Sequence, residues 1–231
     1  MHPMTPTEIM RATDAIGTIG AAFYYHPDTI AIGKDAGLDG FRFYILGRGG
    51  VLGDVEPAVV HAAFGYFHPA LIDKMWTSAS ERMAPRDAAR LYHRAAHELA
   101  RKELADVEGL DGFVDAVTQI VDHVEGASLP LFAATRAEPV PDDAPAAALH
   151  QAMVLRELRG SVHLLALTAT GLDTPTAHAI KRPDDVQTFG YQDAPEVGDA
   201  DRAKWDQAEA LTDELLTPAY ASLSDDQAAA L

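Results

Sequence analysis

The chain has 231 residues, no cysteine and a formal net charge of −17 at pH 7, and 48% of its residues are hydrophobic. The length suits one or two domains with a sizeable core, and the lack of cysteine excludes disulfides, thiolate catalysis and Cys-based metal sites. The N-terminus MHPMTPTEIM lacks the order of a signal peptide, and no apolar run reaches the length of a membrane span. We therefore expect a cytoplasmic protein that does not contact a membrane.

The first half of the chain has helical periodicity that proline and glycine interrupt at short intervals. Thr5-Pro6-Thr7-Glu8 has the pattern of a capping box and predicts a helix to about Tyr25. The segment GLDGFRFYILGRGG has helical spacing of its apolar residues, although its FRFYIL stretch also fits a strand. The other helices expected in this half end near residue 37, begin near residues 57 and 69, and run from 85 to about 106.

The second half is expected to be built around one long helix. Apolar residues from Phe113 to Val124 form an amphipathic stripe, and the Pro- and Asp-rich segment 125–145 is interpreted as a connection over the surface. The remaining predicted elements are a central helix at about 146–169, a short helix from Thr174, a polar loop at 181–199, a long helix at 205–216 and a helix start in SDDQAAAL.

These patterns predict an all-α protein, a multi-helix bundle around the buried central helix at about 146–169. We expect a helical core domain at 1–182, followed at 183–231 by an acidic loop and a C-terminal helix.

The glycine-rich segment GRGGVLG, at 47–53, superficially resembles a phosphate-binding loop. Its glycine spacing differs from a dinucleotide fingerprint, and the chain offers no strands to build the parallel sheet that such a loop needs. We interpret it as a helix end and turn. Arg48 stands apart, because a turn needs no arginine.

His93 and His97 have the i, i+4 spacing of two metal ligands on one helix face. A helical wheel centred on Ala88 puts both beside Arg90, Arg94 and Arg101, on a face that we interpret as solvated and cationic. We therefore predict no metal site there, and no cofactor.

The central helix carries charge inside an oily stretch, in the sequence RELRGSVH at 156–163. A helical wheel gives two apolar stripes, which is typical of a helix buried between neighbours. Polar residues occupy the two gaps between the stripes: Arg156, Arg159 and His163 lie in one, and His150, Glu157 and Ser161 in the other. Gly160, in mid-helix, suggests a close approach by a backbone or a ligand.

Three stretches resemble a known family: GFRFYILGRGGVLGDVEPAVVHAAFGYFHPALI, LPLFAA and ALHQAMVLRELRGSVHLLALTATGLD. They are similar to a bacterial, chiefly actinobacterial, family described as helix-turn-helix or MarR-like. The family pattern contains GRAAPLG, F-x-P and LREHRGDGH. The matching residues are Arg48, Pro69, Arg156, Glu157, Arg159, Gly160 and His163. The departures are Leu158, Ser161 and Val162.

The resemblance also implies a missing part. Such relatives carry a winged-helix segment before a final helix with an E…TD pattern, and AEALTDELLTPAYASL resembles that last helix. Between Arg182 and Trp205 there is only a short acidic loop. From this gap and the net charge of −17 we expect no specific nucleic-acid partner.

The leading functional prediction is a small-molecule-binding protein whose ligand is anionic and partly apolar. The predicted ligand-binding residues are Arg48, Arg156, Arg159, His163 and His68. One alternative is an enzyme that anchors an anionic substrate with arginines, and its candidate acid-base residues are His150, Glu157 and His163. The other alternative is a MarR-like transcriptional regulator. A structural ion-pair network also explains the charged gap, and a homodimer is left open.

Overall fold

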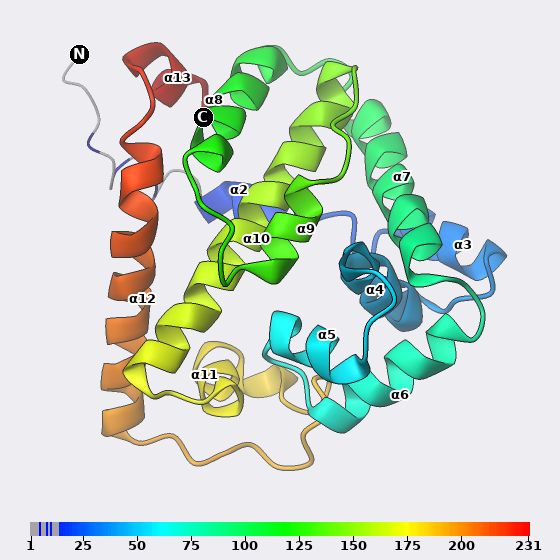
Figure 1. Cartoon of the computed structure of the whole chain (residues 1–231), viewed down its shortest axis with the longest axis vertical. Helices are drawn as coiled ribbons and strands as arrows, with labels where there is room; N and C mark the ends of the chain where they lie inside the picture. The colour runs from blue at the N-terminus through cyan, green and yellow to red at the C-terminus, as the bar shows by residue number, and fades with distance from the viewer. Residues whose placement is uncertain (1–4, 6–7, 9, 11–13) are drawn as a thin grey trace.

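The computed structural model describes Thr5, Glu8, Met10 and residues 14–231, and in this part of the chain it contains helices and no β-strand. The predicted all-α class is therefore confirmed. Figure 1 shows the helices arranged around α10 (Ala144–Thr170), which runs obliquely through the middle of the molecule. No helix in the described residues is long and apolar enough to cross a membrane.

The other helices begin and end close to the proline and glycine residues that interrupt the helical periodicity of the sequence. In chain order they are α2 (Asp14–Ile19), α3 (Pro27–Asp35), α4 (Gly40–Gly49), α5 (Pro57–Phe64), α6 (Pro69–Ser80), α7 (Pro85–Glu103), α8 (Leu110–Asp122), α9 (Pro130–Arg136), α11 (Thr174–Lys181), α12 (Asp199–Tyr220) and α13 (Asp225–Ala230). Short 3₁₀ helices follow α4 at Gly50–Leu52 and α11 at Pro183–Asp185.

Proline begins several of these helices because its fixed φ angle suits the first turn, where its missing N–H costs nothing. In α3 and α6 the preceding histidine completes the cap. The Nδ1 atoms of His26 and His68 accept hydrogen bonds from the backbone N–H groups of Asp28 and Ala70, at 3.2 Å each. His68, which we predicted to bind a ligand, thus serves as a helix cap.

The central helix α10 is buried on more than one side, as its two apolar stripes predict. It packs against α12, α8, α7, α9 and α2. Leu149 and Met153 belong to the core shared with α4 and α7, whereas Leu158 belongs to the core shared with α8 and α12. Ala166 and Leu167 join a third cluster with α11 and α12. Polar groups on this helix therefore lie between protein layers.

The glycine-rich segment is a helix end and turn, as expected, and it also brings α4 close to α7. A Cβ atom at Gly47 would lie 2.6 Å from the Tyr92 ring, and one at Gly50 would lie 2.0 Å from the Pro85 carbonyl oxygen. Gly53 then turns the chain with a φ of +87°. The contact of α4 with α7 requires these small residues, and it orients Arg48.

Three boundaries differ from the predictions. The capping box forms, since Thr5 N–H donates to Glu8 Oε2 at 2.7 Å. The helix predicted to reach Tyr25 is shorter, because α2 ends at Ile19 and turns lead from there to Tyr25. Residues 6–7, 9 and 11–13 lie outside the described part. Segment 125–145 contains α9, whose Leu131 and Phe132 are buried. The last long helix begins earlier, at Asp199. Tertiary burial stabilises α9 within a segment whose composition indicates a loop.

Candidate functional site

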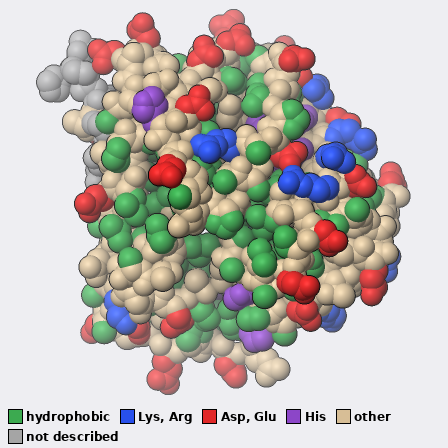
Figure 2. All heavy atoms as spheres, viewed as in Figure 1, with side chains coloured by type: hydrophobic (Ala, Val, Ile, Leu, Met, Phe, Trp, Pro, Cys, Tyr) green, Lys and Arg blue, Asp and Glu red, His purple; other side chains and the backbone are tan. Residues whose placement is uncertain are grey.

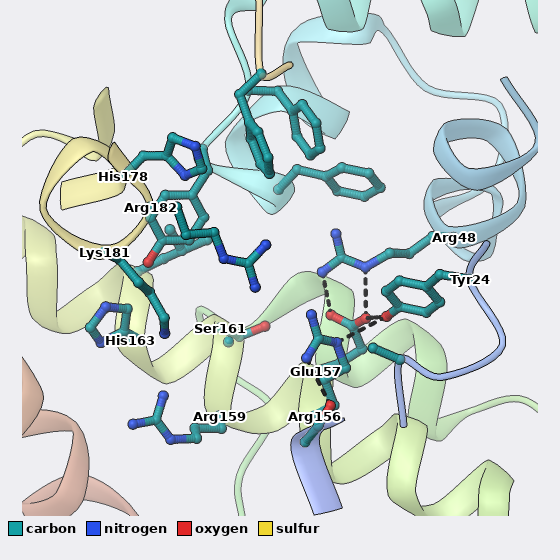
Figure 3. Close-up of a pocket in the computed structure, with 18 of the residues that line it drawn as sticks. Tyr24, Arg48, Arg156, Glu157, Arg159, Ser161, His163, His178, Lys181 and Arg182 are labelled. Atoms are coloured by element: carbon teal, nitrogen blue, oxygen red, sulfur yellow. Dashed lines mark hydrogen bonds and ion pairs between the residues drawn. The ribbon is translucent and has the colours of Figure 1, made fainter. Parts of the chain in front are cut away.

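A cavity of about 860 Å³ lies along the charged side of α10. Its walls come from α4, α5, α10, α11, α12 and the segment that follows α11. Figure 3 shows the polar side chains in two groups. One surrounds Glu157 and Arg48, and the other contains Arg159, His163, Lys181 and Arg182.

The first group is a closed ion-pair network. Arg48 binds Glu157 with both ends of its guanidinium, Nε to Oε1 at 2.7 Å and Nη2 to Oε2 at 2.7 Å. Tyr24 donates to Glu157 Oε1 at 3.2 Å, and Arg156 donates through Nε to the Tyr24 hydroxyl at 3.1 Å and through Nη1 to the Gly17 carbonyl at 2.8 Å. Charge-assisted bonds of this kind hold a buried carboxylate in one position.

This network keeps Glu157 ionised. Burial alone would raise the pKa of its carboxyl group, but Arg48, and after it Arg156, more than offset that effect and hold the pKa below its usual value. Glu157 is therefore a counter-ion to Arg48 and has no proton to give near neutral pH. Of the two charged gaps on α10, the structure joins Arg156 of one to Glu157 of the other through Tyr24.

The second group lies between α10, α11 and α12. Arg159 donates to Glu209 Oε2 at 2.8 Å, and His163 Nε2 lies 3.6 Å from Glu209 Oε1. Lys181 and Arg182 complete the group at the end of α11, where both keep contact with solvent. Within the described part of the chain, neither has a carboxylate within ion-pair distance, and Lys181 Nζ lies over the Trp205 ring at 5.7 Å.

The cavity is more positive than the protein as a whole. Its described lining contains five cationic side chains, Arg48, Arg156, Arg159, Lys181 and Arg182. Only three carboxylates line it, those of Glu157, Asp185 and Glu209. With neutral histidines, this leaves an excess of two positive charges, in a chain whose net charge is −17. An anionic guest would offset the excess.

Aromatic rings form the remaining wall. Phe67 stacks on Phe189 with ring centroids 4.3 Å apart, and Phe189 in turn contacts His178 at 3.9 Å. Phe41, Phe64 and Tyr44 extend this surface from α4 and α5. The cavity therefore combines an apolar face with a cationic one, which suits a guest with an apolar body and a charged end.

Both histidines in the lining favour the neutral form. Burial, the largest effect, lowers the pKa of His163 to about 4, although Glu209 acts in the opposite direction. Burial likewise lowers the pKa of His178. The Nε2 atoms of both are buried and have no hydrogen-bond partner. Unpaired buried polar atoms are uncommon in proteins, and they mark positions where a bound molecule can supply the missing bond.

The structure separates the predicted site residues into two sets. Arg48, Arg156, Glu157, Arg159 and His163 all line the cavity. His68 and His150 lie outside its lining.

His150 instead contacts His93 and His97 of α7. Its Nδ1 lies 3.3 Å from His97 Nε2, and its ring centroid is 5.6 Å from that of His93. The prediction that His93 and His97 occupy a solvated face is therefore wrong. His93 is buried and His97 half-buried, because α7 packs against α10 as well as α4. Among the described residues, no group of three or more His, Asp or Glu is arranged to hold a metal ion.

Several residues of the cavity were missed in the sequence. Lys181, Arg182 and Phe189 lie in a segment that its composition marks as a polar loop, and Glu209 lies on α12. The KR pair at the end of a short helix was the available signal, since adjacent cations occur in this chain only there and at Arg101-Lys102.

The fold and the cavity define an all-helical protein with a cationic internal site. Comparison with known families extends this description. A family model described as "Helix-turn-helix family" matches residues 9–196. The chain belongs to this helix-turn-helix family. No curated protein and no solved structure matches the chain.

Family membership contradicts the expectation of no specific nucleic-acid partner, because the helix-turn-helix is a motif by which proteins dock in the DNA major groove. The expectation gave too much weight to the net charge of −17, which describes the whole surface and not one face. It also assumed that a winged segment after Arg182 was needed, whereas the match extends over nearly all the helices before that point.

Proposed function

We propose that this protein is a DNA-binding transcriptional regulator, MarR-like in its use of a ligand, whose affinity for DNA is set by a small anionic molecule in the central cavity. Membership of the helix-turn-helix family is the observation that carries the DNA-binding part. The cationic, aromatic-walled cavity of about 860 Å³ supports the ligand-binding part.

The pair α5 and α6 has the short, glycine-containing connection of a helix-turn-helix. The two helices pack against each other and are joined by the four residues Gly65 to His68. Such turns commonly contain a glycine, and Gly65 has a φ of +77°. Asp73, Lys74 and Thr77 of α6 are exposed and available to contact a duplex.

The same unit supports a route from ligand to DNA. Ala63 and Phe64 of α5 and Tyr66 and Phe67 of the turn line the cavity. An occupant therefore contacts the helix-turn-helix directly, without a relay through the core. Repacking of these rings around an occupant would change the position of α6. A ligand that makes better contacts with one position of α6 than with another shifts the equilibrium between them.

Phosphate contacts have a separate candidate surface. Figure 2 shows acidic side chains scattered over the visible face and most Lys and Arg gathered where α7 runs in Figure 1. The exposed basic residues of α7 include Arg86, Arg90, Arg94 and Arg101. Each forms an ion pair with a neighbouring carboxylate. The pairs of Arg90, Arg94 and Arg101 are exposed on both sides, and such pairs are weak enough to exchange for phosphate.

Two measurements test this function. Selection from randomised duplexes should yield a preferred sequence, and fluorescence anisotropy should show salt-dependent binding that is at least ~1,000-fold tighter than to an unrelated duplex.

A thermal-shift panel of apolar carboxylates and phosphate esters should identify acids that raise Tm in the wild type but not in Arg182→Ala. Arg202→Ala, an exposed change on α12, is the matched control. Absence of any preferred duplex would overturn the regulator, and absence of any stabilising anion would overturn the ligand-binding part.

A further inference from the structure

The tautomer of His163 follows from its neighbour on α12. The Thr212 hydroxyl donates to the Ala208 carbonyl oxygen at 2.7 Å, and a hydroxyl has only one hydrogen to give. Thr212 Oγ1 also lies 3.0 Å from His163 Nδ1. In that contact the oxygen can only accept, so Nδ1 carries the proton. The neutral ring therefore leaves Nε2 with a lone pair and no proton, in a residue that lines the cavity.

That lone pair has no donor. His163 is 3% exposed, and its Nε2 is buried without a hydrogen-bond partner. The nearest charged atom is Glu209 Oε1 at 3.6 Å, which is itself an acceptor. The other oxygen, Glu209 Oε2, accepts from Arg159 at 2.8 Å. Two acceptors thus lie 3.6 Å apart without a donor between them, and a buried acceptor without a donor is costly.

The charges around His163 decide which kind of donor fits. Arg159 on α10 and Lys181 on α11 both disfavour further positive charge at His163, and Arg182 adds to the positive charge around Lys181. Glu209 on α12 opposes them, but it is already paired with Arg159. The Trp205 ring closes the remaining side, with its centroid 5.2 Å from that of His163. A neutral O–H group fits this environment better than an ammonium group.

We infer that His163 Nε2 and Glu209 Oε1 form a hydroxyl-recognition subsite, and that the ligand is a hydroxy acid with an apolar body. Its oxyanion is held by Lys181 and Arg182, and its hydroxyl donates to His163. The hydroxyl lies close to the charged group, because Lys181 Nζ is 5.7 Å from the centroid of the Trp205 ring, which is itself 5.2 Å from that of His163. This inference rests on the proposed ligand-binding function and specifies its ligand class.

The test compares two acids that differ only in the hydroxyl group, 3-phenyllactate and 3-phenylpropanoate. Isothermal titration calorimetry should give the hydroxy acid at least a ~10-fold lower Kd with the wild type, the upper range of a hydrogen bond to a neutral group. In His163→Phe the two acids should bind equally, and His163→Gln, whose amide oxygen can accept, should recover part of the preference. Far-UV circular dichroism and Tm establish that the variants are folded.

Nitrogen-15 NMR of the imidazole gives an independent readout. The free protein should show a protonated Nδ1 and an unprotonated Nε2 at His163, and the hydroxy acid should shift the Nε2 signal more than the deoxy acid does. Equal affinity of the wild type for the two acids, or a protonated Nε2 in the free protein, would overturn the inference while leaving the proposed function in place. If neither acid binds at millimolar concentration, the inference is overturned, whereas the ligand-binding function is decided by the wider panel of carboxylates and phosphate esters.

Discussion

Arg48 and Glu157 lie 109 positions apart in the sequence and form a two-pronged ion pair on the wall of the cavity, with both N–O distances at 2.7 Å. The pair connects the end of α4 to the middle of α10. It is shielded from water, since the Arg48 side chain is 15% exposed and that of Glu157 is 5% exposed. Arg48 also lies 4.2 Å over the Phe64 ring of α5, so the pair supports the aromatic wall.

Removing one member of this pair should be costly. In Glu157→Gln the Arg48 guanidinium keeps its charge without a counter-ion, and we expect the free energy of unfolding to fall by about 3 kcal/mol. Urea denaturation followed by circular dichroism measures this change. The double variant Arg48→Met/Glu157→Met, which removes both charges of the pair, should recover most of the loss. A single variant that loses less than about 1 kcal/mol would show that the pair is solvated in solution.

The histidine cluster between α7 and α10 should make stability depend on pH. Burial is the largest effect on all three members, and it lowers the pKa of His93 to about 4, of His97 to about 4 and of His150 to about 3. The unfolded chain therefore binds these protons at a higher pH than the folded one. Stability is complete above an unfolded pKa of about 6.5 and declines as pH falls toward the folded values.

The decline should approach about 1.4 kcal/mol per pH unit for each proton, with a smaller share from His97, which is half-buried. Denaturant titrations between pH 6.5 and 5 measure this slope above the range in which most carboxylates titrate. His93→Gln/His150→Gln should reduce it by the share of these two residues, while His97 and the buried His163 keep part of it, and His123→Gln, on the surface, should leave it as in the wild type. Equal slopes in the wild type and the double variant would contradict the assignment to this cluster.

DNA affinity should depend on the arginine stripe of α7. Arg90→Glu/Arg94→Glu should weaken binding similarly for all duplex sequences and reduce the salt slope by about 2, one for each lost phosphate contact. The charge-matched control is Lys34→Glu/Arg202→Glu, two exposed changes on α3 and α12. Anisotropy titrations at several salt concentrations separate the outcomes. The same slope in both double variants would exclude α7 from the interface.

The order and boundaries of the helices could largely be predicted from local sequence patterns, whereas the side of the cavity that α11 and α12 form could not. Proline at the start of α5, α6 and α7 fixes their boundaries within the chain itself. The double apolar stripe of α10 likewise predicted its central place. By contrast, the wheel of α7 assigns one face to the interior, but α10 covers a second face and buries His93. No local pattern shows that Glu209, on α12, approaches Arg159 and His163.

The close contact of the 3₁₀ helix after α4 with α7 predicts a severe effect of a single methyl group. A Cβ atom at Gly50 would lie 2.0 Å from the backbone carbonyl oxygen of Pro85, which cannot rotate away as a side chain would. Gly50→Ala should therefore lower the free energy of unfolding by about 3 kcal/mol, the upper range for overpacking. Thermal and urea denaturation measure the loss. Gly17→Ala, where the added Cβ meets nothing within 4 Å, is the control, and a similarly mild effect at Gly50 would contradict this packing.

Gly160 should behave in the opposite way, because its empty side is the cavity. It lies in the middle of α10, lines the cavity, and an added Cβ would meet nothing within 4 Å. Alanine is the better helix former, so Gly160→Ala should raise the free energy of unfolding of the unliganded protein by about 1 kcal/mol.

The new methyl group would nevertheless occupy space that an anionic guest needs beside Arg159 and Ser161. We expect the affinity for 3-phenyllactate to fall at least ~10-fold, which corresponds to about 1.4 kcal/mol. Calorimetry and denaturation on the same sample test both effects. Greater stability with unchanged affinity would show that the guest does not cover this turn of α10, and lower stability would show that the space beside Gly160 is already filled by protein.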